Sequence, residues 1–257
     1  MKRVMGTALC ALLAGGIAHA NAETKLTIAT VNNGDMIRMQ KLTDDFTSKN
    51  PDISLEWVTL EENTLRQRVT TDIATKGGQY DVMTIGTYEV PIWADKGWLA
   101  PLDNLGADYD VDDIMPAIRA AVSKDDALYA APFYGESSMM MYRTDLFEKA
   151  GVEINGRLTW DQTLEIAKKL HDPDNGVYGI CLRGKAGWGE NMALISTMGN
   201  AYGARWFDEE WKPTFDGAEW KNALDMYTNI LGNYGPPGAT SNGFNENLSL
   251  FNSGKCG

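Results

Sequence analysis

A regular alternation of short β-rich runs and amphipathic helical stretches constrains the fold most strongly. The first half of the chain has three predicted strands, over residues 26–31, 53–57 and 81–85. Between them, apolar side chains recur three or four positions apart over residues 36–46 and 65–73, as in amphipathic helices. The first of these predicted helices has the apolar face Met36, Met39, Leu42 and Phe46. Strand–helix units that follow one another this closely indicate a parallel sheet with right-handed crossovers, so the sequence predicts an α/β fold.

The second half of the chain continues this pattern less regularly. Its predicted strands cover residues 128–133, 138–142 and 177–182. Thr159 and Gln162 have the spacing of a capping box, which predicts that a helix begins there and runs over residues 160–170. Two further amphipathic helices are predicted over residues 220–230 and 244–251.

The N-terminus has the features of a secretory signal peptide over residues 1–22. Lys2 and Arg3 precede a largely apolar run over residues 4–17, and small residues suited to cleavage follow. A membrane anchor is the alternative, but the run falls short of the ~20 apolar residues that a span requires. Lipid attachment at Cys10 is also disfavoured, because the apolar run continues past it. We therefore expect export, with a mature chain that begins near residue 23.

The charge balance and the scarcity of histidine exclude several function classes. Loss of Lys2 and Arg3 would take the formal net charge from −12 to about −14, which disfavours nucleic acid and anionic lipid as partners and favours a monomer. His171 is then the only histidine, so His-rich metal sites and Ser-His or Cys-His nucleophiles are not expected. His171 precedes a turn-type cluster over residues 172–176 and is predicted to end a helix. No metal or cofactor is predicted.

Two cysteines, Cys181 and Cys256, remain after cleavage. An even pair in an exported chain favours one disulfide bond, with two buried thiols as the alternative.

Polar and aromatic side chains gather in the loops that follow the predicted strands. Ligands of open parallel sheets bind at the carboxyl ends of the strands, where these loops meet. Carboxylate, amide and guanidinium groups can bridge vicinal hydroxyls, while Tyr and Trp faces cover C–H edges, as recognition of a polyol or sugar requires. The paired carboxylates Glu62 and Glu136 leave open an alternative, the acid and nucleophile of a carbohydrate-active hydrolase.

Five segments of the chain resemble the sorbitol/mannitol-binding proteins of bacterial ABC importers. The segments are LTIATVNNGDMIRMQ, WVTLEENTLRQRVTTDIATKGGQYDVMTIGTYEVPIW, PFYGESSMMMYRTDLFEKAG, GICLRGKAGWGENMAL and PPGATSNGFNENLSLFNSGKCG. The resemblance extends from about Leu26 to the last residue. It places the chain with the extracellular solute-binding proteins of the maltose-binding type.

The resemblance implies a two-lobed periplasmic-binding-protein fold of type II that closes on its ligand and docks on membrane permease subunits. It implies a periplasmic transport component for sugar alcohols, not an enzyme. The first lobe would cover residues 23–133 and the second residues 134–257. Family members continue beyond Gly257, and an α/β layer normally adds a strand after a helix such as the last one here. We therefore expect this fold to be C-terminally incomplete.

The resemblance also implies ligand contacts at particular positions. Those expected on the first lobe are Asn32, Asn33, Glu62, Thr87 and Tyr88. Those expected near the hinge or on the second lobe are Tyr134, Glu136, Arg183, Trp188, Glu190 and Asn245.

Overall fold

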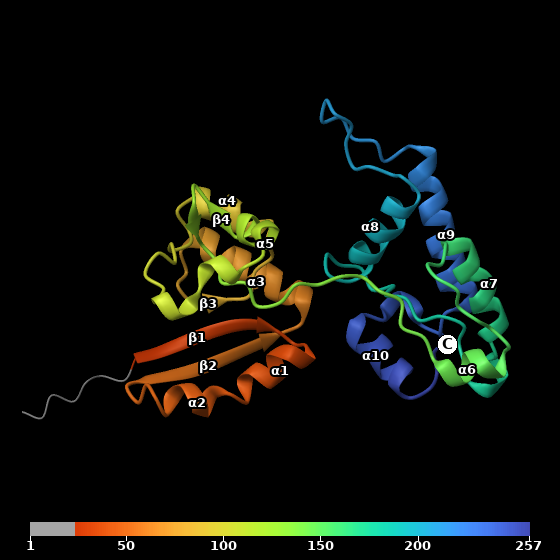
Figure 1. Cartoon of the computed structure of the whole chain (residues 1–257), viewed down its shortest axis with the longest axis horizontal. Coiled ribbons are helices and arrows are strands. Elements are labelled where there is room, and N and C mark those ends of the chain that lie inside the picture. The colour runs from red at the N-terminus through yellow and green to blue at the C-terminus, as the bar shows by residue number, and fades with distance from the viewer. Residues whose placement is uncertain (1–23) are drawn as a thin grey trace, which may run out of the picture.

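Two bodies joined by an extended segment make up the computed structural model, which describes residues 24–257 (Figure 1). Residues 129–143, which connect the bodies, contain neither helix nor strand. We call residues 24–128 the first body and residues 144–257 the second body. The signal peptide predicted over residues 1–22 lies outside the described residues. Between residues 24 and 257, no helix is both long enough and apolar enough to cross a membrane.

The first body is built on a parallel sheet with the strand order β2-β1-β3. Strands β1 (Thr24–Val31) and β2 (Ile53–Leu60) pair along their whole length, from Thr24 opposite Ile53 to Val31 opposite Leu60. Strand β3 is shorter than predicted, with two residues, Val82–Met83. This order puts the carboxyl ends of all three strands at one edge of the sheet, as the sequence predicts.

Helices cover this sheet and extend the first body. They are α1 (Gly34–Gln40), α2 (Thr43–Thr47), α3 (Glu62–Thr75), α4 (Glu89–Asp95) and α5 (Pro116–Ala121), with short 3-10 turns at Ala107–Tyr109 and Val111–Asp113. A small antiparallel pair, β4 (Ser123–Lys124) and β5 (Ala127–Leu128), precedes the connecting segment. The main core cluster consists of Ala29, Val31, Met36, Leu65, Val69 and Trp93.

The single helix predicted over residues 36–46 is wrong in one respect, because the chain breaks it into α1 and α2. The hydroxyl of Thr43 donates to the carbonyl of Gln40 at 2.7 Å and accepts from Trp57 Nε1 at 2.9 Å, which ties the start of α2 to strand β2. As a result Met36 is buried, whereas Leu42 and Phe46, predicted on the same apolar face, are 53% and 39% exposed.

The second body is dominated by helices. They are α6 (Thr144–Lys149), α7 (Trp160–Leu170), α8 (Asn191–Ala201), α9 (Ala218–Tyr234) and α10 (Phe244–Asn252), with 3-10 turns at Pro173–Asn175 and Ala239–Ser241. The predicted capping box is present: Gln162 N donates to Thr159 Oγ1 at 3.2 Å, and Thr159 N donates to Gln162 Oε1 at 2.9 Å. Helices α7, α8 and α9 bury Ala167, Met198 and Ile230 in a common core.

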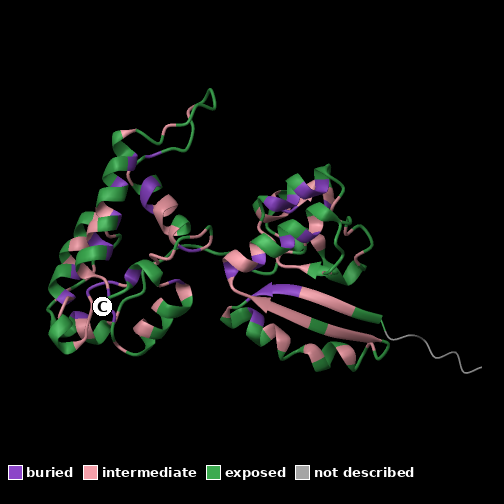
Figure 2. Ribbon diagram, turned by 180° about the vertical axis from the view of Figure 1, so that it is seen from behind, coloured by how far each residue is buried: buried purple, intermediate pink, exposed green. Residues whose placement is uncertain are grey.

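Most of the strands predicted in this half of the chain are wrong. Of the run 128–133, only Leu128 lies in a strand, and residues 138–142 lie in none. The run 177–182 forms only isolated bridges, between Asp172 and Val177 and between Tyr178 and Cys256. A strand requires a partner for its backbone groups, and residues 138–142 have no backbone partner within residues 24–257. Figure 2 shows the connecting segment largely exposed, unlike the buried carboxyl end of β1 and the buried faces of the helices.

A disulfide bond joins Cys181 and Cys256, whose Cα atoms are 5.8 Å apart. Backbone hydrogen bonds flank it, from Tyr178 N to Lys255 O at 2.9 Å and from Gly257 N to Tyr178 O at 3.0 Å. The residues after α10 are therefore fixed to the segment that follows α7.

Candidate functional site

The edge formed by the carboxyl ends of β1 and β2 contacts the second body and the connecting segment. Asn33 caps α1, because its Oδ1 accepts from Met36 N at 2.9 Å. Its Nδ2 donates to the hydroxyl oxygen of Tyr134 at 3.2 Å, across to the connecting segment. Desolvation raises the pKa of Tyr134, although 41% of the residue is exposed. The backbone oxygen of Asn32 accepts from Nδ2 of Asn245 in α10 at 3.2 Å.

A largely buried network of ion pairs, Glu62–Arg66–Glu89, lies beside this edge, at the start of α3. Arg66 Nε lies 2.7 Å from Glu62 Oε1, and Arg66 Nη1 lies 3.0 Å from Glu89 Oε2. Glu89 Oε2 also accepts from the backbone N–H of Gly86 at 2.6 Å. These ion pairs therefore hold Glu62 in place, and Glu89 fixes the loop that carries Thr87 and Tyr88.

The indole of Trp188 reaches this group from the second body. The guanidinium carbon of Arg66 is 5.0 Å from the centroid of the indole, within cation–π range. The ring of Tyr88 lies 5.4 Å from the same indole, tilted by 46°. Desolvation, and next the Glu89 carboxylate, raise the pKa of Tyr88. The Trp188 indole of the second body thus packs against Arg66 and Tyr88 of the first body.

A second pair of contacts, one ion pair and one hydrogen bond, links the two bodies. Lys185 Nζ lies 2.8 Å from Glu61 Oε1, and Asn63 Nδ2 donates to the backbone oxygen of Ala186 at 3.1 Å. Burial acts to raise the pKa of Glu61, but Lys185 and the backbone N–H of Thr64 outweigh it and leave that pKa below its ordinary value. The hydrogen bond to Glu61 raises the pKa of Lys185 in turn. The loop that carries Trp188 is therefore anchored on the first body.

Arg183 and Glu190 are engaged within the second body. Arg183 Nη1 donates to the backbone oxygen of Gly189 at 2.6 Å. Glu190 is 2% exposed, and its Oε2 accepts from the backbone N–H of Phe244 at 3.0 Å. Burial raises the pKa of the Glu190 carboxyl. In this geometry both side chains stabilise the loop over residues 183–190 and the start of α10.

An open concavity of 3210 Å³ extends between the two bodies. It is lined by eight of the eleven predicted ligand contacts, namely Asn33, Glu62, Thr87, Tyr134, Glu136, Arg183, Trp188 and Asn245. Asn32, Tyr88 and Glu190 are outside its lining. Small-molecule pockets usually measure ~300–1,000 Å³, so a small ligand would occupy only part of this space.

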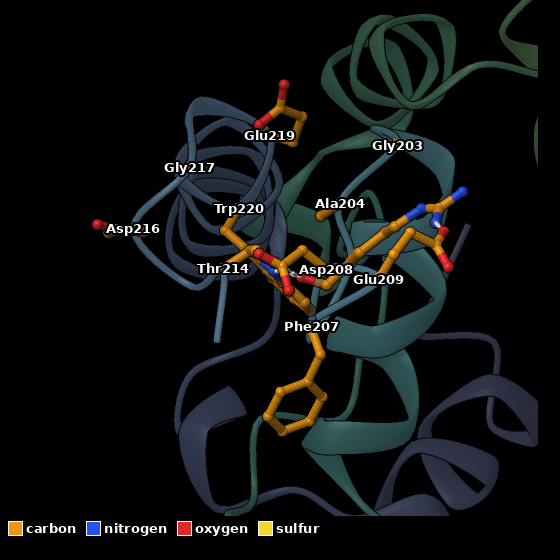
Figure 3. A pocket seen from close by; sticks show the side chains of 11 residues that line it. Gly203, Ala204, Phe207, Asp208, Glu209, Thr214, Asp216, Gly217, Glu219 and Trp220 are labelled. Carbon is orange, nitrogen blue, oxygen red and sulfur yellow. Dashed lines mark hydrogen bonds and ion pairs between the residues drawn. The ribbon is translucent and has the colours of Figure 1, made fainter. Parts of the chain in front are cut away.

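A smaller hollow of 460 Å³ lies in the second body, at the loop over residues 203–217 (Figure 3). Its lining includes Phe207, Trp220 and the carboxylates Asp208, Glu209 and Glu219. None of the predicted ligand contacts lines it, so we place the candidate site at the sheet edge.

Sequence reasoning missed the groups that hold the site together. The spacing of Glu62 and Arg66 was a usable signal, because residues four apart on a helix can form an ion pair. No local pattern indicated Glu89 or Lys185, whose partners lie 23 and 124 residues away.

The chain matches the family model described as bacterial extracellular solute-binding protein over residues 33–257. A mannitol-binding protein of Pseudomonas aeruginosa is 61% identical over 246 residues, which are 96% of this chain and 56% of the relative. A solved ABC-transporter solute-binding protein of Agrobacterium vitis, with bound D-mannitol, has 66% identity and a TM-score of 0.88. That alignment covers 91% of this chain and 57% of the other.

A second solved structure shares the fold at lower identity. It is an ABC-transporter solute-binding protein of Agrobacterium radiobacter in complex with ribitol, at 24% identity and a TM-score of 0.77, covering 91% of this chain and 59% of the other. The chain thus spans little more than half the length of the curated relative and the two solved structures.

Proposed function

Because this chain belongs to the bacterial extracellular solute-binding proteins, we propose that it is part of the polyol-binding component of an ABC importer. D-mannitol and its stereoisomer sorbitol are the proposed ligands. The observation that carries this proposal is the high identity to the A. vitis protein with bound D-mannitol, together with the identity to the P. aeruginosa mannitol-binding protein.

The chemistry of the sheet edge supports a small, neutral, hydroxyl-rich ligand. Glu62, Asn33 and Tyr134 present a carboxylate, an amide and a hydroxyl from two parts of the chain, and all three line the concavity. A hydrogen bond to a charged group contributes roughly 1.5–3 kcal/mol, so a few such bonds can hold a flexible linear polyol. Trp188 would serve as a wall against the carbon chain.

Motion of two lobes is part of the same proposal. The first lobe would cover residues 23–133 and the second residues 134–257, with the hinge in the connecting segment. Ligand between the lobes would favour the closed form, which then docks on the membrane permease. Delivery to the periplasm by cleavage of the leader over residues 1–22 and action as a monomer complete the proposal.

The alternative, a carbohydrate-active hydrolase that uses Glu62 and Glu136, is not proposed. The curated relative and the two solved relatives described above are binding proteins by name, which favours binding without turnover.

Titration calorimetry tests the proposal. We would titrate two proteins, the 257-residue chain and a chimera that extends it beyond Gly257 with the C-terminal part of the P. aeruginosa relative. We expect saturable binding of D-mannitol or sorbitol, at one ligand per protein and more tightly than maltose. Tight maltose binding without a response to any polyol would contradict the assignment, and release of product from chromogenic glycosides would support the hydrolase.

A further inference from the structure

The ion-pair network Glu62–Arg66–Glu89 is unusual because one guanidinium lies between two carboxylates and all three side chains are largely buried. The side chains of Glu62, Arg66 and Glu89 are 9%, 16% and 4% exposed. A buried carboxylate that loses its partner is strongly destabilising. Arg66 is therefore the group on which both acids depend.

Arg66 also contacts the loop that follows β3 and the indole of Trp188. Its Nη1 donates to the backbone oxygen of Thr84 at 3.1 Å as well as to Glu89, whose carboxylate holds the N–H of Gly86. These bonds fix the loop that follows β3. Its guanidinium carbon lies over the indole ring of Trp188 in the second body, 5.0 Å from the ring centroid. Arg66 thus links the helix, the loop and the wall that supply several of the proposed ligand contacts.

The two oxygens of Glu62 have different roles. Arg66 engages Oε1, and no hydrogen bond to Oε2 occurs within residues 24–257. Glu62 lines the concavity, so Oε2 remains an acceptor for a ligand hydroxyl while Oε1 fixes the direction of the carboxylate. The planar fork of a guanidinium can serve two carboxylates and stack on an indole at the same time, which an ammonium cannot do.

We propose that Arg66, supported by Glu89, is a positioning residue of the polyol site. It acts by orienting Glu62 Oε2 and the Trp188 indole toward the ligand and makes no bond to the polyol itself. This inference rests on the proposed function, and it adds two residues, Arg66 and Glu89, that are absent from the predicted ligand contacts.

The first experiment needs no ligand. Fluorine-labelled tryptophan is incorporated into the chain, and the resonance of Trp188 is assigned by its loss in Trp188→Phe. We expect Arg66→Met to shift that resonance, while Arg68→Met, an exposed arginine on the same helix, leaves it in place. An unchanged Trp188 resonance in folded Arg66→Met would contradict the positioning role.

The second experiment is a double-mutant cycle on D-mannitol affinity in the chimera. Arg66→Met should weaken binding by about tenfold or more, and Glu62→Gln by a similar factor. If Arg66 acts through Glu62, the double variant should bind little worse than Glu62→Gln alone. Losses that multiply in the double variant would show that Arg66 does not act through Glu62 and would overturn the proposal.

A third variant covers the case in which Arg66→Met does not fold. Glu89→Gln keeps the shape of the side chain but removes its charge, and it should shift the Trp188 resonance and weaken D-mannitol binding by a few fold, as expected of a neutral partner for Arg66. Wild-type affinity with an unchanged resonance in Glu89→Gln would contradict the role of the pair. Failure of the unaltered chimera to bind any polyol would instead refute the proposed function, while the ligand-free resonance still decides the geometry.

Discussion

The two bodies differ in how their extended segments are paired. In the first body β1 and β2 form a complete parallel ladder, and the core cluster lies against it. In the second body the segment over residues 177–182 forms only isolated bridges, and helices α7, α8 and α9 provide the core. A β-rich run thus predicts an extended backbone, but it becomes a strand only where a partner lies beside it.

The disulfide should give the largest difference between the bodies. Cys181→Ser with Cys256→Ser removes a link between residues 75 apart in sequence, and loss of such a bond typically costs about 2–5 kcal/mol. We expect amide exchange to speed up in α10 and over residues 178–182 while β1 and β2 keep their protection. Equal loss of protection in β1 would show that the two bodies unfold as one unit.

Matched core truncations test the same independence. Leu65 in α3 and Ile230 in α9 are both fully buried, and truncation of either to alanine should cost about 2–5 kcal/mol. Each variant should lose amide protection mainly in its own body, as measured by hydrogen exchange with mass analysis. Loss spread evenly over both bodies in either variant would contradict the division.

The capping box provides a smaller and more local test. Thr159→Ala removes the side-chain acceptor for Gln162 N and should destabilise α7 by about 0.5–2 kcal/mol. Urea denaturation measures the loss. Thr43→Ala cannot serve as the control, because the Thr43 hydroxyl accepts a hydrogen bond from Trp57 Nε1. Thr228→Ala, an exposed position in α9, is the matched control and should change stability less. Equal effects would show that the cap is not important to the second body.

The ion pair between Glu61 and Lys185 should give the smallest effect. Both side chains are partly exposed, so Lys185→Met should cost only about 0–1 kcal/mol at neutral pH. The pKa of Glu61 is lowered on folding, so its contribution is present above the ordinary value of 4.5 and is lost as the pH falls through the folded pKa. The pKa of Lys185 is raised, so its contribution is full below 10.5 and is lost as the pH rises through the folded pKa.

Urea midpoints of the wild type and Lys185→Met therefore should differ at neutral pH and converge under acid conditions. Glu61→Gln keeps an acceptor for the cap of α3 and should reproduce the loss. A difference that grows as the pH falls below 4.5 would contradict the ion pair.

Local patterns predicted those parts of the fold that local physics decides. The apolar period of α3, α7 and α9 and the capping box at Thr159 depend on residues three or four apart, and all are present. The break between α1 and α2 was not predicted, because it involves a hydrogen bond from Trp57, which lies in strand β2. The missing strands of the second body fail for the same reason, since a pairing partner is a property of the whole chain.

The candidate site divides in the same way. The ligand contacts that the family resemblance implies include Asn33, Glu62 and Trp188, and these three residues line one concavity in the structure. The bonds of Arg183 and Glu190 within the second body were not predicted, because Gly189 and Phe244 meet them only in the folded chain. Their role as ligand contacts remains a prediction that alanine variants can test.

The claim that both bodies bind one polyol is tested most directly by hydrogen exchange in the chimera with and without D-mannitol. We expect added protection on both sides of the concavity, at the start of α3 in the first body and over residues 183–190 in the second, with little change in the presence of maltose. Protection confined to one body, or produced by maltose and not by D-mannitol, would contradict it.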